Sequence, residues 1–262
     1  MEQYAAAAYC ANNNDAKAGT ALTCPAGNCP LVESAGARSL VEFQNIGLVD
    51  VTGFMAVDHT NQLIVISFRG SESLGNWIGD LNIELIPSTL CPGCLVHAGF
   101  YTSWALVRDT INQTLQTATE SWPNYSVVSV GHSLGAAIAT IGAAELRAQG
   151  HEATLYTYGS PMVGNILLAD FITNQASNFR VTRYYDVVPK LPGYPIGYAH
   201  VSPEYWIDLP GKTNPSTQDV EVSSGALDLV GDEGKLGFSI SDHLWYFGGI
   251  TACALEALEL SL

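Results

Sequence analysis

The chain has 262 residues, 47% of them apolar, and its 25 acidic against 10 basic side chains give a formal net charge of -15 at pH 7. This balance argues against nucleic acid and against anionic membranes as partners, because both attract basic residues. No apolar run reaches the ~20 residues of a membrane-spanning helix, so we expect no transmembrane segment.

The length suits one α/β domain with a large core, and we find no repeat, low-complexity stretch or Pro/Ser-rich linker. We therefore predict a single domain over residues 1–262. Six cysteines indicate an oxidising, extracellular location, although no signal peptide precedes Met1-Glu2-Gln3, which we expect to start a processed chain. Asn112 and Asn124 begin glycosylation sequons.

The first strong strand signal in chain order is the apolar run Leu63-Ile-Val-Ile-Ser-Phe68, which ends in the turn Arg69-Gly70-Ser71. Directly after it, apolar residues recur at helical spacing: Leu74, Trp77, Ile78 and Leu81. This stripe is typical of a short amphipathic helix that packs on the core. The glycines within it predict a helix of low intrinsic stability.

Further along, Cys91-Pro-Gly-Cys94 has the spacing of a redox pair or half a zinc site. No second pair or histidine lies at ligand spacing from it, so we expect neither a metal nor another cofactor.

The most informative segment is Gly131-His-Ser-Leu-Gly135, which follows the apolar run Tyr125–Val130 and precedes the small-residue run Ala136–Ala144. A serine on such a strand-turn-helix elbow projects over the end of a sheet as an exposed nucleophile. The glycines let helix and strand approach closely. The pattern predicts Ser133 as a nucleophile.

A serine nucleophile needs a histidine base and a carboxylate that orients the histidine. With this elbow, acid and base follow the serine in the chain. Asp186 comes at the end of the alternating run Phe179–Tyr185, and open α/β sheets place their chemistry at the carboxyl ends of strands. Asp170 falls in the predicted helix 166–175. Four further aspartates lie in polar or turn-rich stretches, where we expect them to be solvated: Asp208, Asp219, Asp228 and Asp232.

The pattern does not choose between His200 and His243 as the base, and the other would be a buried, hydrogen-bonded core histidine. Acyl transfer also needs donors for the oxyanion. We expect the backbone N–H of Leu134, directly after the nucleophile, and Ser71, in the turn after the earlier strand, to supply them.

The chain resembles the class 3 lipases of filamentous fungi, of the Thermomyces and Rhizomucor type, nearly end to end. The matching motifs are residues 5–10, 67–71, 76–78, 97–100, 131–135, 158–165, 186–192, 197–200, 203–206 and 243–247. The resemblance implies an α/β-hydrolase fold, with a central, mostly parallel sheet and helices on both faces. It also implies that His243 is the base, that Asp186 is the acid, and that Ser71 and Leu134 form the oxyanion hole.

The resemblance further implies a lid at about residues 72–82 that carries the stripe. An acyl-binding trough is expected from five residues by family position: Ile83, Leu85, Ile86, Val188 and Leu191. The implied disulfides are Cys10–Cys253, Cys24–Cys29 and Cys91–Cys94.

The sequence thus predicts a secreted serine lipase, a triacylglycerol lipase, that cleaves long-chain acylglycerol esters at a lipid-water interface and needs no obligate protein partner. Ala136, where many members have glycine, also occurs in related feruloyl esterases, so an esterase or a phospholipase with the same triad stays open. A catalytically inactive binding protein on the same fold is the alternative from another class.

Overall fold

The computed structural model describes residues 1–47 and 50–254; of the predicted domain 1–262, residues 48–49 and 255–262 lie outside this description. The helices are α1 (Glu2–Ala7), η1 (Ala11–Asn13), α2 (Pro30–Ala35), α3 (Leu74–Gly79), α4 (Ala98–Ser121), α5 (Leu134–Ala148), α6 (Ile166–Gln175), η2 (Tyr194–Ile196), η3 (Thr217–Asp219), η4 (Asp232–Gly234) and α7 (Ile240–His243). The strands are β1 (Arg38–Ile46), β2 (Val51–Asp58), β3 (Leu63–Phe68), β4 (Leu85–Pro87), β5 (Leu95–His97), β6 (Ser126–His132), β7 (Ala153–Tyr158), β8 (Asn178–Arg183), β9 (Glu204–Ile207) and β10 (Val220–Ser223).

Eight strands form one sheet in the order β1-β2-β3-β6-β7-β8-β9-β10. The pairs from β3 to β9 are parallel, while β1-β2, β2-β3 and β9-β10 are antiparallel. The predicted α/β fold with a mostly parallel sheet is therefore confirmed. Strands β4 and β5 form a separate hairpin, and no helix in the described part of the chain is long and apolar enough to cross a membrane.

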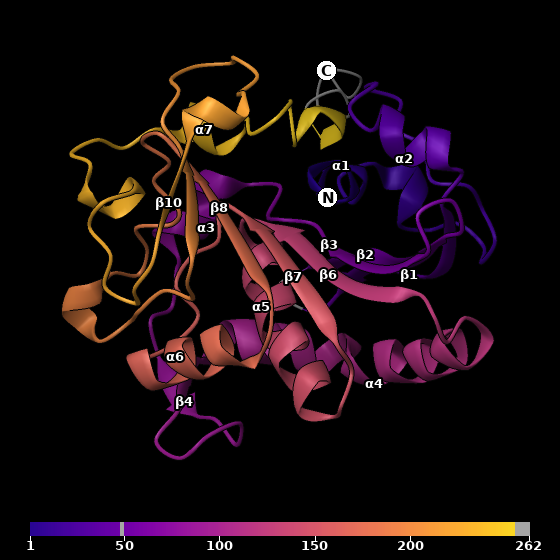
Figure 1. Cartoon of the computed structure of the whole chain (residues 1–262), viewed down its shortest axis with the longest axis horizontal. Coiled ribbons are helices and arrows are strands. Elements are labelled where there is room, and N and C mark those ends of the chain that lie inside the picture. The colour runs from indigo at the N-terminus through magenta and orange to yellow at the C-terminus, as the bar shows by residue number, and fades with distance from the viewer. Residues whose placement is uncertain (48–49, 255–262) are drawn as a thin grey trace.

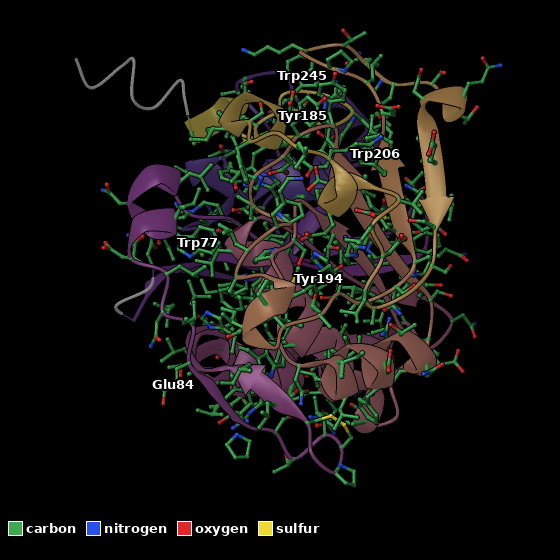
Figure 2. All side chains as sticks on the ribbon, turned by 90° about the vertical axis from the view of Figure 1, so that its left-hand side faces the viewer. Trp77, Glu84, Tyr185, Tyr194, Trp206 and Trp245 are labelled. Atoms are coloured by element: carbon green, nitrogen blue, oxygen red, sulfur yellow. A yellow bond between two sulfur atoms is a disulfide. The ribbon has the colours of Figure 1, made fainter. Side chains whose placement is uncertain are left out.

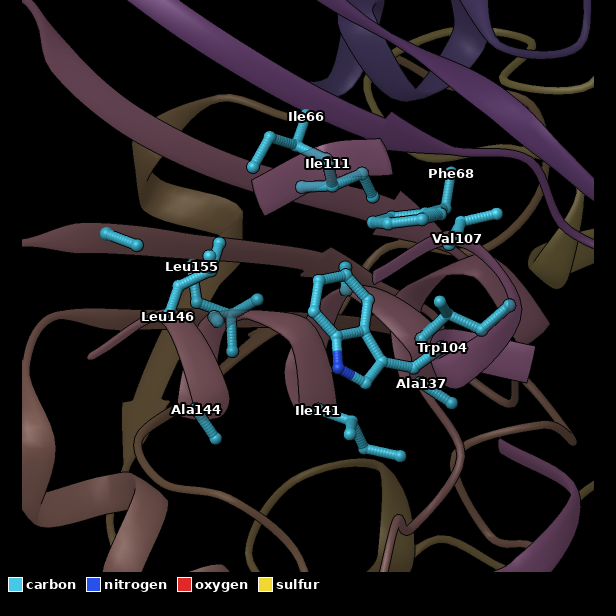
Figure 3. Packing of buried hydrophobic residues seen from close by; sticks show 14 of the residues in the cluster. Ile66, Phe68, Trp104, Val107, Ile111, Ala137, Ile141, Ala144, Leu146 and Leu155 are labelled. Atoms are coloured by element: carbon cyan, nitrogen blue, oxygen red, sulfur yellow. The ribbon is translucent and has the colours of Figure 1, made fainter. Parts of the chain in front are cut away.

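The two faces of the sheet are covered by different helices, with α4, α5 and α6 on one side and α1 and α2 on the other (Figure 1). Side chains along β3 alternate between these sides, as the period of two in a strand requires. Ile64, Ile66 and Phe68 belong to the core with α4 and α5, while Val65 belongs to the core with α1. Figure 3 shows Phe68 and Ile66 with Trp104 of α4 and Ile141 of α5. The nucleophile elbow thus rests on a sheet buried from both sides.

Three disulfides join Cys10 to Cys253, Cys24 to Cys29 and Cys91 to Cys94, the pairs that the resemblance implies. The first ties the segment after α1 to the end of the described chain. The sulfurs of Cys10, Cys24 and Cys253 gather within 4.8 Å of one another. Because each of these sulfurs already belongs to a disulfide, the cluster consists of covalent cross-links and is not a metal site.

One expectation about the acidic residues is wrong. Asp228 is 8% exposed and Asp232 is fully buried, whereas turn-rich surroundings predicted solvated carboxylates. Asp232 lies 3.5 Å from the Lys190 ammonium, in a segment that folds its charged side chains against the body of the protein. Lys190 lowers the cost of burying this group, yet burial and then the Asp186 charge raise the pKa of Asp232 to about 9, so its carboxyl is protonated at neutral pH.

Candidate active site

Ser133 lies on a tight elbow between β6 and α5, with backbone angles φ 58° and ψ -129°. This conformation is strained for a residue with a side chain, and such strain is held only where the surroundings enforce it. The flanking glycines allow the packing, because a Cβ on Gly131 would collide with the Gly135 carbonyl. A Cβ on Gly135 would collide with the Phe68 carbonyl of β3. The geometry agrees with the reasoning that singled out this serine.

Asp186 and His243 form a buried pair behind the elbow. His243 Nδ1 lies 2.9 and 2.8 Å from the two Asp186 carboxylate oxygens. Because a carboxylate accepts, Nδ1–H donates, and the Nε2 lone pair of the neutral ring remains free. Asp186 also accepts from the Val188 N–H at 2.9 Å and from the Tyr246 hydroxyl at 2.6 Å. The carboxylate is therefore fixed by three donors.

Asp186 stands three residues beyond the end of β8, whereas the alternating pattern placed it directly at the strand end. Tyr184, at φ 38°, turns the chain there. Tyr246 is a member of the site that sequence reasoning missed. Burial and the Asp186 charge raise the pKa of its hydroxyl, which keeps it a donor. The sequence places Tyr246 in the matching motif 243–247, three residues after His243, but that position gives its hydroxyl no role.

Two buried polar atoms at this site have no hydrogen-bond partner within the described residues, and they are Ser133 Oγ and His243 Nε2. A hydroxyl donor and an imidazole acceptor are complementary. Buried unpaired polar atoms are rare in native proteins and often mark reactive groups. Hydrogen bonds of this kind are frequently long before substrate binds.

Gly159 supports the same cluster from the end of β7. A Cβ at this position would lie 2.7 Å from Tyr246 Oη, 2.8 Å from Asp186 Oδ2 and 2.8 Å from His243 Cε1. Its φ of 58° is also in the left-handed region that favours glycine. The Gly159 backbone thus packs directly on Asp186 and His243, and no local sequence pattern predicts this contact.

His132, the residue before the nucleophile, connects several parts of the site. Its ring lies 4.4 Å from the His243 ring between centroids, and its Nε2 lies 2.8 Å from the His243 carbonyl. Burial, reinforced by His243, lowers its pKa well below the ordinary value, so the ring is neutral. Nε2–H therefore donates to the carbonyl, and Nδ1 accepts from the Tyr9 hydroxyl at 2.6 Å. Tyr9 in turn accepts from the Gly70 N–H at 3.1 Å.

The two residues expected to form the oxyanion hole border one cavity of about 430 Å³. Leu134 is the first residue of α5, where backbone N–H groups have no helical partner. Ser71 lies in the turn after β3 and borders the same cavity. The same cavity is lined by Trp77, Leu81 and Phe100.

The predicted lid forms a short helix, α3, and Leu81 lies beyond its end. Its apolar stripe is only half-buried rather than buried in the core. Trp77 stacks on Phe100 with ring centroids 6.4 Å apart, and Figure 2 shows it between α3 and the rest of the molecule. The packing is thus partial and one-sided.

The five expected acyl-binding residues differ in their exposure to solvent. Ile83 is exposed, Leu85 and Ile86 are half-buried in β4, Val188 is buried, and Leu191 is half-buried. Their assignment to an acyl trough remains a prediction.

His200, the other histidine that the pattern left open, lies away from the Asp186 carboxylate. Its Nε2 donates to the Pro189 carbonyl at 2.8 Å and lies 3.7 Å from Glu233. Burial, with a contribution from Arg180, lowers its pKa to about 3. It is a neutral, hydrogen-bonded core histidine.

The chain is similar to known lipases in sequence and in structure. Residues 65–195 match the Lipase (class 3) family and residues 1–40 match the Lipase 3 N-terminal region. Secreted mono- and diacylglycerol lipase A of Penicillium cyclopium is 46% identical over 254 residues, covering 95% of this chain and 83% of that protein. Secreted mono- and diacylglycerol lipase 1 of Fusarium solani is 39% identical over 98% of this chain and 77% of its own length. The crystal structure of mono- and diacylglycerol lipase from Aspergillus oryzae matches with a TM-score of 0.93 at 45% identity, over 96% of each chain. The resemblance is confirmed, and the chain belongs to the class 3 lipase family.

Proposed function

We propose that this protein is a secreted, single-domain lipase that hydrolyses acylglycerol esters through an acyl-enzyme on Ser133. The observation that carries the proposal is the buried Asp186-His243 pair beside a strained serine elbow. The apolar lid stripe and the net charge of -15 favour a neutral lipid surface over an anionic one. Relatives that are named secreted mono- and diacylglycerol lipases support the substrate class and the location.

The free Nε2 of His243 takes the proton of Ser133 as Oγ attacks the ester carbonyl. Negative charge then develops on the carbonyl oxygen, where the Leu134 N–H and Ser71 donate to it. The imidazolium gives the proton to the leaving glycerol oxygen, and Asp186 stabilises the imidazolium while it exists. Water repeats these steps in the second half and releases the fatty acid.

Titration with an active-site serine phosphonate tests the proposal. We expect one equivalent of label on Ser133 and none on Ser133→Ala. His243→Ala should label and turn over several orders of magnitude more slowly. An unlabelled wild-type protein that is folded would instead be a binding protein.

Rates measured side by side then define the substrate. We expect diacylglycerol and monoacylglycerol to be cleaved faster than phosphatidylcholine and methyl ferulate. The rate on triacylglycerol, compared with the rates on diacylglycerol and monoacylglycerol, defines which acylglycerols are substrates. Faster cleavage of methyl ferulate would identify a feruloyl esterase, and faster cleavage of phosphatidylcholine a phospholipase.

A further inference from the structure

The segment between β10 and α7 exposes its apolar side chains. Leu236 is fully exposed and Phe238 is 80% exposed, which is unusual for large apolar residues in a water-soluble protein. Earlier in the same segment three more are more than half exposed: Leu227, Leu229 and Val230. We refer to residues 227–238 as the inverted segment.

Its charged side chains point the other way. Asp228 and Asp232 are buried, and the side chain of Glu233 is 12% exposed. The ammonium of Lys235 lies over the Trp206 ring, 4.3 Å from its centroid. All four charged residues of the segment are therefore turned inward, and its outer face presents hydrocarbon.

Lys190, from the body of the protein, holds this arrangement in place. Its ammonium donates to the backbone carbonyls of Asp232 and Lys235, the latter at 3.1 Å, and lies 3.5 Å from the Asp232 carboxylate. A buried cation that binds carbonyls at both ends of η4 fixes the backbone between them. The backbone held by Lys190 thus directs the following side chains, Leu236 and Phe238, toward solvent.

Glycines bring the segment close to the protein surface. A Cβ on Gly231 would collide with the Glu204 carboxylate, and one on Gly237 would lie 2.7 Å from the Tyr185 ring. Tyr185 and Trp206 lie beside the C-terminal part of the chain in Figure 2. Gly237 thus packs closely against the Tyr185 ring, while its neighbours Leu236 and Phe238 project into solvent.

The segment leads directly into the active site. Ser239 donates its N–H to the Tyr185 carbonyl at 2.7 Å and pairs with Asp186 as an isolated bridge. Its hydroxyl accepts from the Asp242 N–H at 3.0 Å and so caps α7, which ends at His243. The end of the inverted segment is therefore joined directly to the backbone that carries Asp186 and His243.

We propose that the inverted segment is a lipid-contact site separate from the lid, which inserts Leu236 and Phe238 into a neutral lipid surface. This proposal rests on the proposed lipase function and adds a lid-independent anchor to it. A lipid surface fits better than a protein partner, because the outer face offers no charged group for a specific interface. Protruding hydrocarbon with charges folded inward is suited to insertion into the interface.

The test measures binding alone, in the Ser133→Ala protein, so that no product alters the surface. The probe is a phosphatidylcholine vesicle that contains dioleoylglycerol, and the readout is the partition coefficient from flotation. In Leu236→Ser/Phe238→Ser, the loss of each side chain should reduce the partition coefficient about tenfold. The matched control is Leu31→Ser/Leu106→Ser, which removes two exposed leucines on α2 and α4, and it should leave partitioning within twofold.

A second measurement does not depend on loss of binding. The Ser133→Ala parent already contains five tryptophans, so the readout is the difference in emission between Phe238→Trp and this parent. This difference should shift to the blue and be quenched by brominated lipid when vesicles are added. Trp77→Ser, made in the same protein, should keep this shift, because the anchor does not require the lid.

Three results would overturn the anchor. They are partitioning of the double variant within twofold of its parent, equal loss in the control, or a difference emission between Phe238→Trp and its parent that vesicles leave unchanged. A parent protein that sediments as a dimer, and a double variant that sediments as a monomer and binds vesicles normally, would assign the segment to self-association. Since none of these measurements uses turnover, failure of the anchor is distinguishable from failure of Ser133 to react with the phosphonate.

Discussion

The Tyr9 hydroxyl, 2.6 Å from His132 Nδ1, links the segment after α1 to the residue that precedes the nucleophile. Through the Gly70 N–H it also contacts the turn that carries Ser71. Tyr9→Phe removes a donor and an acceptor at once and leaves two buried polar groups unpaired. We expect a loss of about 1–3 kcal/mol in the free energy of unfolding. We also expect about a tenfold fall in kcat on a soluble ester, equivalent to about 1.4 kcal/mol of positioning.

Tyr4→Phe is the matched control, since Tyr4 lies in α1, close to Tyr9 in sequence, and donates to Asp58 at 2.6 Å, away from the elbow. It should lower stability without changing kcat. Equal losses of kcat in both variants would show that this N-terminal region contributes only general stability.

Gly159→Ala should inactivate the enzyme while leaving it folded. Its Cβ would displace Asp186, His243 and Tyr246 together, and a shift of about 1 Å at a catalytic group costs on the order of 100-fold in rate. Gly36→Ala has a similar positive φ, 66° against 58°, with nothing within 4 Å of the added carbon. Both should lose about 1–2 kcal/mol of stability from the backbone. Only Gly159→Ala should lose kcat, and similar kcat values would argue against the contact.

His200 gives the protein a defined dependence of stability on pH. Its pKa is about 3 in the folded state against 6.5 in the unfolded state, because burial and then Arg180 disfavour the charged ring. Between these values only the unfolded chain binds the proton, so stability falls as the pH falls. In His200→Gln this contribution is absent. The stability difference between wild type and variant should therefore change by about 1.4 kcal/mol per pH unit in this range, in the variant's favour at lower pH.

Urea unfolding from neutral pH downward measures this difference. A gap independent of pH would mean that His200 is accessible to protons in the folded state. Because His200 binds Pro189 rather than the triad, the variant should also keep most of its kcat.

Trp77→Ser tests whether α3 acts as a lid. Exposing a large apolar side chain costs about 1.5–3 kcal/mol in water, and a lipid surface removes that cost, so only the interface favours an open helix. Activity on emulsified diacylglycerol should fall far more than activity on a soluble short-chain ester. Trp122→Ser, which removes a half-buried tryptophan that stacks on Tyr125, should affect both substrates alike. Equal effects of Trp77→Ser on both would identify α3 as fixed structure.

Local patterns predicted the parts of this protein that are local in origin. The bounds expected for β3 and α6 match those observed, because apolar periodicity and glycine turns define them within a few residues. The elbow at Ser133 could be predicted for the same reason, because its strand, turn and helix are all defined by local sequence. Asp186 was predicted as the acid from its position after a strand, and this role stays a prediction; Tyr184 turns the chain before it.

The contacts that sequence reasoning missed join distant segments. Tyr9 and His132 are 123 residues apart, and Tyr246 and Asp186 are 60 apart, so no spacing rule brings them together. The inverted segment was misread for another reason. A hydropathy pattern assumes that acids face water, and here Lys190, a residue from elsewhere in the chain, reverses that direction for Asp232.

The Cys10–Cys253 disulfide, whose two cysteines are 243 positions apart in sequence, turns nearly the whole described chain into a covalent ring. A proteinase that cuts one surface loop within this ring opens it without releasing either piece. The nicked protein keeps its segment around Tyr9 joined to the part that carries His243, and it separates into fragments only after reduction. In a medium that contains proteinases, a first cleavage within the ring therefore does not release any fragment from the molecule.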